Sequence, residues 1–263
     1  MPERTEYAHG TPSWVDLATT DVAGAETFYG GVLGWDAERM PTGNGIYLMQ
    51  RIRGIDAAGI YEQPEDWKAG GMPPSWTTYI SVDDVDATTA KVAPAGGMVM
   101  MDPFDVMDVG RMSVVGDPTG AVIALWQAKG DARARLVREQ GAISWNELTS
   151  SDAAKSRTFL EEVLGVTHVL SPGFGDYTMM MVDGAPVAGV VQRMEEMPET
   201  GSPWLVYFAV DDCDAAFAKA TSTGGSAIVP PMDIPPGRFS ILKDPQGAVF
   251  AVMTVNPDYS PGG

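Results

Sequence analysis

The feature of this sequence that most constrains its fold is a long internal repeat. Three blocks occur twice in the same order, with the two copies 127 to 131 residues apart. The blocks are residues 14–21, 82–87 and 110–122, and their copies are residues 145–152, 210–215 and 237–249. A period of roughly 20–50 residues would indicate a solenoid or a propeller. This period has the size of a whole domain, so the chain is predicted to be a duplicated domain.

The length of 263 residues allows two domains of ordinary size. We expect a first domain at residues 1–130, a linker at residues 131–141 and a second domain at residues 142–263. The linker is distinguished by three basic residues, Arg133, Arg135 and Arg138.

A shorter pattern recurs within each half. A strand at residues 13–19 is followed by Asp21 at an N-cap position, a helix at residues 25–32 and Gly34 at the C-cap position. Further strands follow, and the pattern starts again with a strand at residues 76–82, Asp84 and a helix at 85–93. Both units recur in the second half. The sequence therefore predicts an α+β fold of four βαβββ units.

This arrangement resembles the vicinal-oxygen-chelate superfamily, which includes glyoxalase I, bleomycin-resistance proteins, fosfomycin-resistance enzymes and extradiol dioxygenases. The resemblance rests on the opening that contains Phe28-Tyr29 and Leu33-Gly34-Trp35, on the repeated Val-Asp-Asp segments and on two Asp-Pro-x-Gly turns. It is closest in shape to a two-domain actinobacterial subgroup described as glyoxalase-like, hydroxylase or 27-kDa antigen-type proteins, some of them encoded in antibiotic gene clusters, including anthracycline clusters. The resemblance implies a tandem duplication in which four units form two cup-shaped mixed sheets.

Members of this superfamily that use a metal typically bind it through a His on the first strand of a unit and a Glu on the last. The corresponding positions here are Trp14, Thr77 and Ala124 in the first half and Trp145, Leu205 and Ala251 in the second, with the remaining position near Ala58 or Ile60 and near Ala188 or Val190. These side chains cannot replace imidazole nitrogens or carboxylate oxygens as ligands. The chain has only two histidines, His9 and His168. We therefore expect no metal site and no cofactor.

Strand alternation places Trp14 and Asp16 on the cup face, and Val15 and Leu17 beneath the helix. The same alternation gives a set of aromatic, thioether and hydroxyl side chains as candidates for ligand binding. They are Trp14, Tyr47, Met49, Thr77, Tyr79 and Trp126 in the first cup, and Trp145, Tyr177, Met179, Tyr207 and Met253 in the second. Such side chains suit irregular apolar or aromatic ligands. The alternative is that they fill a cavity that has lost its metal.

Asp16 and Glu147 are the candidate catalytic residues, because each is a carboxylate expected beside aromatic walls. Either could pair with a cationic ligand, assisted by a cation–π contact with the neighbouring Trp. In an apolar cup its pKa could instead rise enough for general acid or base catalysis. A structural carboxylate bonded to backbone amides or a tyrosine is the third interpretation.

Four further residues recur at equivalent repeat positions. Arg111 and Arg238 could anchor an anionic ligand group or pair with acidic turns. Asp117 and Asp244, in the Asp-Pro-x-Gly segments, are predicted to form turns only.

The net charge of −18 argues against nucleic-acid and anionic-membrane partners. It would attract a cationic small molecule, although a solubility role is the simpler interpretation. No apolar run approaches the ~20 residues of a membrane span, and residues 1–10 lack the apolar segment of a secretory signal. We therefore expect a cytoplasmic protein. Because duplication supplies two domains in one chain, we expect a monomer or a weak homo-oligomer.

The leading hypothesis is metal-independent binding of a hydrophobic or aromatic small molecule, with a natural product as the expected ligand. The role would be antibiotic self-resistance or an accessory step in biosynthesis. The alternative is a glyoxalase-like lyase, isomerase or hydrolase that is cofactorless or uses an unusual metal, with Asp16 or Glu147 as acid or base. A protein-interaction module is a third possibility.

Overall fold

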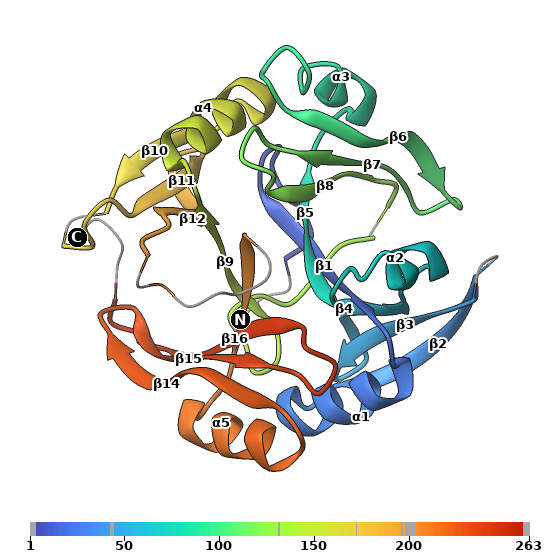
Figure 1. The fold of residues 1–263 in the computed structure, drawn as a ribbon, viewed down its shortest axis with the longest axis vertical. Helices are drawn as coiled ribbons and strands as arrows, with labels where there is room; N and C mark the ends of the chain where they lie inside the picture. The colour runs from blue at the N-terminus through green and yellow to red at the C-terminus, as the bar shows by residue number, and fades with distance from the viewer. Residues whose placement is uncertain are drawn as a thin grey trace.

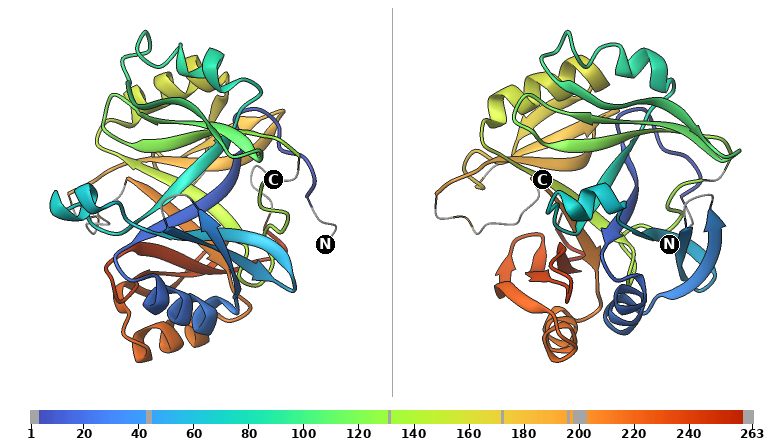
Figure 2. Two further views of the ribbon diagram at one scale, coloured as in Figure 1. Left: turned by 90° about the vertical axis from the view of Figure 1, so that its right-hand side faces the viewer. Right: turned by 45° about the vertical axis from the view of Figure 1, so that its right-hand side comes forward.

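Two eight-stranded mixed sheets, one from each half of the chain, form the body of the protein (Figures 1 and 2). The computed structural model describes residues 4–42, 45–130, 132–171, 173–195, 197 and 203–259. The strand order is β2-β3-β4-β1-β5-β8-β7-β6 in the first sheet and β10-β11-β12-β9-β13-β16-β15-β14 in the second. The two orders are the same, which confirms the predicted duplication and the α+β class.

The elements fall into four βαβββ units. The first half comprises β1 (Pro12–Thr19), α1 (Val22–Leu33), β2 (Asp36–Thr42), β3 (Gly45–Ile52), β4 (Ile55–Glu62), the connecting helix α2 (Glu65–Ala69), β5 (Ser75–Ser81), α3 (Val85–Thr89), β6 (Met98–Val106), β7 (Gly110–Gly116) and β8 (Val122–Ala128). The second half comprises β9 (Ile143–Ser150), α4 (Ala153–Leu164), β10 (Thr167–Leu170), β11 (Thr178–Val182), β12 (Ala185–Gln192), β13 (Trp204–Ala209), α5 (Cys213–Ser222), β14 (Ser226–Ile234), β15 (Gly237–Lys243) and β16 (Val249–Val255).

The caps predicted for the first helix are present. Asp21 accepts a hydrogen bond from the Gly24 N–H at the start of α1, and Gly34 ends the helix in a left-handed conformation. The helix predicted at residues 85–93 is shorter than expected, because α3 ends at Thr89 and continues as tighter turns. Pro94 contributes to the difference, since its ring has no N–H to donate to the Ala90 carbonyl and clashes with that carbonyl in a regular helix.

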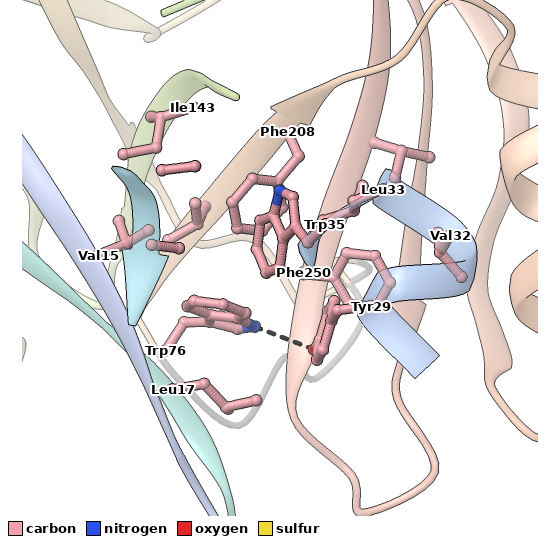
Figure 3. Close-up of a cluster of buried hydrophobic side chains, with 14 of the residues drawn as sticks. Val15, Leu17, Tyr29, Val32, Leu33, Trp35, Trp76, Ile143, Phe208 and Phe250 are labelled. Atoms are coloured by element: carbon pink, nitrogen blue, oxygen red, sulfur yellow. Dashed lines mark hydrogen bonds between the residues drawn. The ribbon is translucent and has the colours of Figure 1, made fainter. Parts of the chain in front are cut away.

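The hydrophobic core crosses the boundary between the halves. Helix α1 lies beside α5, and α3 lies beside α4, so each pair joins the two halves (Figure 1). In the largest cluster the rings of Trp35 and Phe208, from different halves, meet edge to face at 5.2 Å, and so do those of Tyr29 and Phe250 (Figure 3). Gly97 makes room for Phe159, since a methyl carbon there would lie 2.4 Å from that ring.

Buried hydrogen bonds also join the halves. The Tyr29 hydroxyl donates to Asp244 Oδ2 at 3.0 Å and accepts from Trp76 Nε1 at 3.1 Å. At the equivalent place in the repeat, the Ser156 hydroxyl of the second half donates to Asp117 of the first half. The expectation that these two aspartates form turns only was too narrow, because each carboxylate holds its own turn and also binds a helix of the opposite half.

Both sheets follow the predicted division of the chain, but their cores are shared, so the boundaries of independent domains stay a prediction. The first residue of the predicted linker, Asp131, lies outside the described residues. Within the part of the chain that the structure describes, no helix is both long and apolar enough to cross a membrane.

Candidate functional site

Each sheet places four strands at the centre of a cup. In the first cup β1 pairs with β4 and β5, which puts Asp16 beside Gly59 and Thr77. In the second cup β9 pairs with β12 and β13, which puts Glu147 beside Gly189 and Leu205. The two candidate carboxylates therefore occupy equivalent positions.

The residues at the expected metal positions do not fit a divalent metal. These positions lie on the central strands of each sheet, with Trp14 on β1, Thr77 on β5 and Ala124 on β8 in the first, and Trp145 on β9, Leu205 on β13 and Ala251 on β16 in the second. None offers an imidazole or carboxylate donor. Among the described residues no group of three or more His, Cys, Asp or Glu could hold a metal ion.

The residues named for the expected fourth metal position face away from the cups. Ala58 and Ile60 belong to the buried core on the helix side of β4, and Ala188 and Val190 belong to the core beside β12. Gly59 and Gly189 are the cup-facing residues, because a methyl carbon on either would clash with a cup tyrosine. A shift of one residue exchanges the two faces of a strand. A bulge in each β-hairpin, at Gln50/Arg51 and at Met180/Met181, interrupts the alternation there.

Both histidines lie away from the cups. Nδ1 of His9 accepts a hydrogen bond from the Asp83 N–H, and His168 on β10 bonds to Glu161 on α4. Burial lowers the pKa of His168 below its usual value.

A Trp–Tyr–carboxylate arrangement occupies the first cup. Trp14 Nε1 donates to the Tyr47 hydroxyl at 3.0 Å, and the Tyr79 hydroxyl donates to Asp16 Oδ2 at 2.6 Å. Asp16 is only 3% exposed, and its Oδ1 has no hydrogen-bond partner among the described residues. This burial raises the pKa of Asp16 to about 7.

The same arrangement recurs in the second cup. Trp145 Nε1 donates to the Tyr177 hydroxyl at 2.8 Å, and the Tyr207 hydroxyl donates to Glu147 Oε1 at 3.3 Å. Burial raises the pKa of Glu147, although hydrogen bonds from the two tyrosines oppose the shift. Gly189 lets Tyr177 lie across β12, since a methyl carbon there would be 1.9 Å from the hydroxyl oxygen. The repeated pair Gly59 and Gly189 was a signal for this that the sequence reasoning missed.

A cavity of about 280 Å³ lies in the second cup. It is lined by every second-cup residue that the sequence predicted, namely Trp145, Glu147, Tyr177, Met179, Tyr207 and Met253. Residues that the sequence reasoning missed also line it, among them Arg138, Phe174, Phe239 and Tyr259. Three of these four lie outside the regular strands, where periodicity carries no information about orientation.

Several predicted residues of the first cup contact one another or the linker. Trp14 and Trp126 are 9% and 7% exposed, while Tyr47, Met49, Thr77 and Tyr79 are partly buried. The rings of Tyr79 and Trp126 meet edge to face at 6.2 Å. Trp126 Nε1 also donates to the Ala132 carbonyl, and the Tyr7 hydroxyl donates to that of Ala134, so the linker lies against this cup.

Arg111 and Arg238 have a structural role. Arg111 forms a bidentate pair with Asp86 and lies 3.5 Å from Asp105, and Arg238 pairs in the same way with Asp214 and Asp233. Of the two alternatives left open by the sequence, pairing with acidic side chains is the one observed.

A comparison with protein families agrees with the duplicated fold. The family model "Glyoxalase/Bleomycin resistance protein/Dioxygenase superfamily" matches residues 11–125 and 142–252. The chain belongs to this superfamily.

Three known proteins are similar to this chain over most of its length. A Mycobacterium tuberculosis protein named "Putative glyoxylase CFP32" is 46% identical over 98% of this chain and 99% of its own. The "Anthracycline biosynthesis protein DnrV" of Streptomyces peucetius is 36% identical over 97% of each chain. The Mn(II)-bound glyoxalase of Novosphingobium aromaticivorans has a TM-score of 0.65 and 18% identity over 96% of this chain and 83% of its own, a likeness of fold alone.

Proposed function

We propose that the second cup binds a planar aromatic small molecule without a metal ion. The observation that carries this proposal is the cavity of about 280 Å³ lined by aromatic and thioether side chains with one carboxylate. Ligand pockets are typically about 300–1,000 Å³, mostly apolar, with a few polar groups that fix orientation. The cavity lies just below this range and suits a compact ring system.

Metal independence is supported by the donor set. The positions where the superfamily usually carries metal ligands hold Trp145, Leu205, Ala251 and Gly189 in this cup. Glu147 is the one carboxylate that lines the described cavity, and a single carboxylate is too small a ligand set for the divalent ions that these folds use.

The proposed ligand class is an aromatic natural product. This step rests on the similarity to DnrV, whose name places that protein in anthracycline biosynthesis. The proposed role is sequestration for self-resistance or presentation of an intermediate in biosynthesis.

Titration of tryptophan fluorescence with a panel of anthraquinones tests the binding proposal. Wild-type protein, Trp145→Phe and the matched first-cup variant Trp14→Phe should be compared, because Trp145, unlike Trp14, lines the second cavity. We expect saturable quenching that is strongly reduced in Trp145→Phe and kept in Trp14→Phe. Equal quenching in all three proteins, or none with any ligand, would contradict the proposal.

A second candidate function is acid–base catalysis by Glu147. Its carboxyl lines the cavity, accepts a hydrogen bond from Tyr207 and has a raised pKa, as a general acid or base near neutral pH requires. Glu147→Gln separates the two functions. Binding that survives while turnover of a bound ligand is lost would support catalysis, whereas unchanged behaviour in both would leave binding as the function.

A further inference from the structure

The linker places one cationic side chain at the mouth of the second cavity. Of the described residues that line this cavity, Arg138 alone is basic, and it is exposed. Other arginines of the chain, such as Arg51 and Arg238, pair with carboxylates. Among the described residues, the guanidinium of Arg138 has no ion-pair or hydrogen-bond partner. In a chain with a net charge of −18, an arginine without a partner calls for an explanation.

The backbone of Arg138 is held in an unfavourable conformation. Its φ of 57° lies in the left-handed region, which residues other than Gly rarely adopt. The Arg138 N–H donates to the Ile143 carbonyl at 2.9 Å, and Val137 forms a parallel bridge with Ile143. The start of β9 therefore fixes the residue in place. Strain that the surroundings maintain in this way concentrates at functional sites.

The first cup has no equivalent cation. The offset of 131 residues that relates Trp14 to Trp145 relates Tyr7 to Arg138. Tyr7 is buried, and its hydroxyl donates to the Ala134 carbonyl at 2.6 Å. In the first half Tyr7 thus contacts the linker. In the second half Arg138, at the same repeat position, presents its guanidinium to the cavity.

We infer that the ligand of the second cup is an aromatic acid whose anionic oxygen pairs with Arg138 while its rings lie among Trp145, Tyr207 and Phe239. This inference rests on the proposed function and adds the chemical class. A planar guanidinium recognises a carboxylate through two parallel hydrogen bonds, and an ionised phenol or enol offers the same anionic oxygen to one of them. Glu147, on the wall with Tyr207, would face the neutral part of the molecule, such as a ring hydroxyl.

A pair of ligands that differ only in charge tests the inference. Anthraquinone-2-carboxylate and anthraquinone-2-carboxamide would be titrated against wild-type protein and Arg138→Gln, with dissociation constants from tryptophan fluorescence. Wild-type protein should bind the acid about 10-fold more tightly than the amide, which is the contribution of a charge-assisted hydrogen bond. Arg138→Gln should lose this preference and bind the amide as wild-type protein does.

Lys91→Gln is the matched control, because it removes one exposed charge in the first half, away from the cavity. It should keep the preference for the acid. Equal affinities of wild-type protein for the two ligands, or an Arg138→Gln variant that keeps the preference or weakens both ligands equally, would overturn the inference and leave the proposed function standing. If neither ligand binds wild-type protein, nor any other anthraquinone, the proposed function fails with it.

Discussion

The two cups share one framework and differ in what fills it. Each has a Trp that donates to a Tyr, and a second Tyr that donates to a carboxylate. In the first cup Trp126 packs over this arrangement and bonds to the linker. Its copy in the second cup is Met253, which lines the open cavity beside Phe239.

This difference shows how a duplicated domain divides its roles. The early part of the linker accepts hydrogen bonds from Tyr7 and Trp126 beside the first cup. Its later part contains Arg138, which lines the cavity of the second cup. The linker therefore makes the surroundings of the two cups different, although their central strands are equivalent. We propose that contacts in the first cup mainly stabilise the fold, while the cavity of the second cup holds the ligand.

The buried carboxylate of the first cup should give the largest effect. Asp16 has a pKa of about 7 in the folded protein against 3.8 for an ordinary aspartate. Its stabilising contribution is therefore complete below about pH 4 and is lost as the pH rises through 7. The loss amounts to roughly 4 kcal/mol at about 1.4 kcal/mol per pKa unit. Asp16→Asn should lack this fall, which urea unfolding at pH 4 to 8 would measure.

Glu147→Gln serves as the control in the other cup. Glu147 is more exposed than Asp16, and hydrogen bonds from two tyrosines rather than one oppose the rise of its pKa, so its removal should change the pH dependence of unfolding less. A larger effect in the second cup than in the first would reverse the comparison.

Replacing Met253 by tryptophan, the residue at the equivalent position 126 of the first cup, should make the second cup resemble the first. Met253→Trp places an indole in the cavity, and we expect ligand affinity to fall at least about 100-fold, or about 2.7 kcal/mol. Thermal unfolding would show whether the fold survives. A Met253→Trp variant that folds and still binds ligand normally would show that the ligand site lies elsewhere.

The equivalent glycines of the two cups, Gly59 and Gly189, allow a matched test with a smaller expected effect. In Gly189→Ala the new methyl carbon pushes Tyr177 away from β12 toward the cavity, and we expect about a 10-fold loss of affinity. Gly59→Ala displaces Tyr47 in the first cup in the same way and should leave ligand affinity unchanged. Equal losses in both variants would mean that the cups communicate or that both bind ligand.

Much of this architecture could be predicted from the sequence, because its determinants are local and repeated. Asp21 and Gly34 define a helix by capping, and alternation alone places Glu147 and Tyr207 on one face of their strands. Alternation failed at Ala58, where a bulge in the adjoining hairpin intervenes.

Other parts of the site depend on where loops cross, and no local pattern encodes that. Arg138, Phe174 and Tyr259 reach the cavity from a linker, a loop and the C-terminal segment. The cross-half bond from Tyr29 to Asp244 joins residues 215 positions apart. Which cup stays open depends on such contacts, so the sequence alone did not distinguish the two cups.

The smallest expected effect concerns the contact by which the N-terminal segment holds the linker against the first cup. Tyr7→Phe removes the hydroxyl that donates to the Ala134 carbonyl while the ring stays in place. A buried hydrogen bond of this kind contributes about 1 kcal/mol, so the free energy of unfolding should fall by that amount. Because Arg138 lies four residues further along the same linker, affinity for an aromatic acid measures whether the linker acts as one rigid unit. Unchanged affinity would mean that the contacts of Arg138 and Val137 with Ile143 position the guanidinium without help from the first cup.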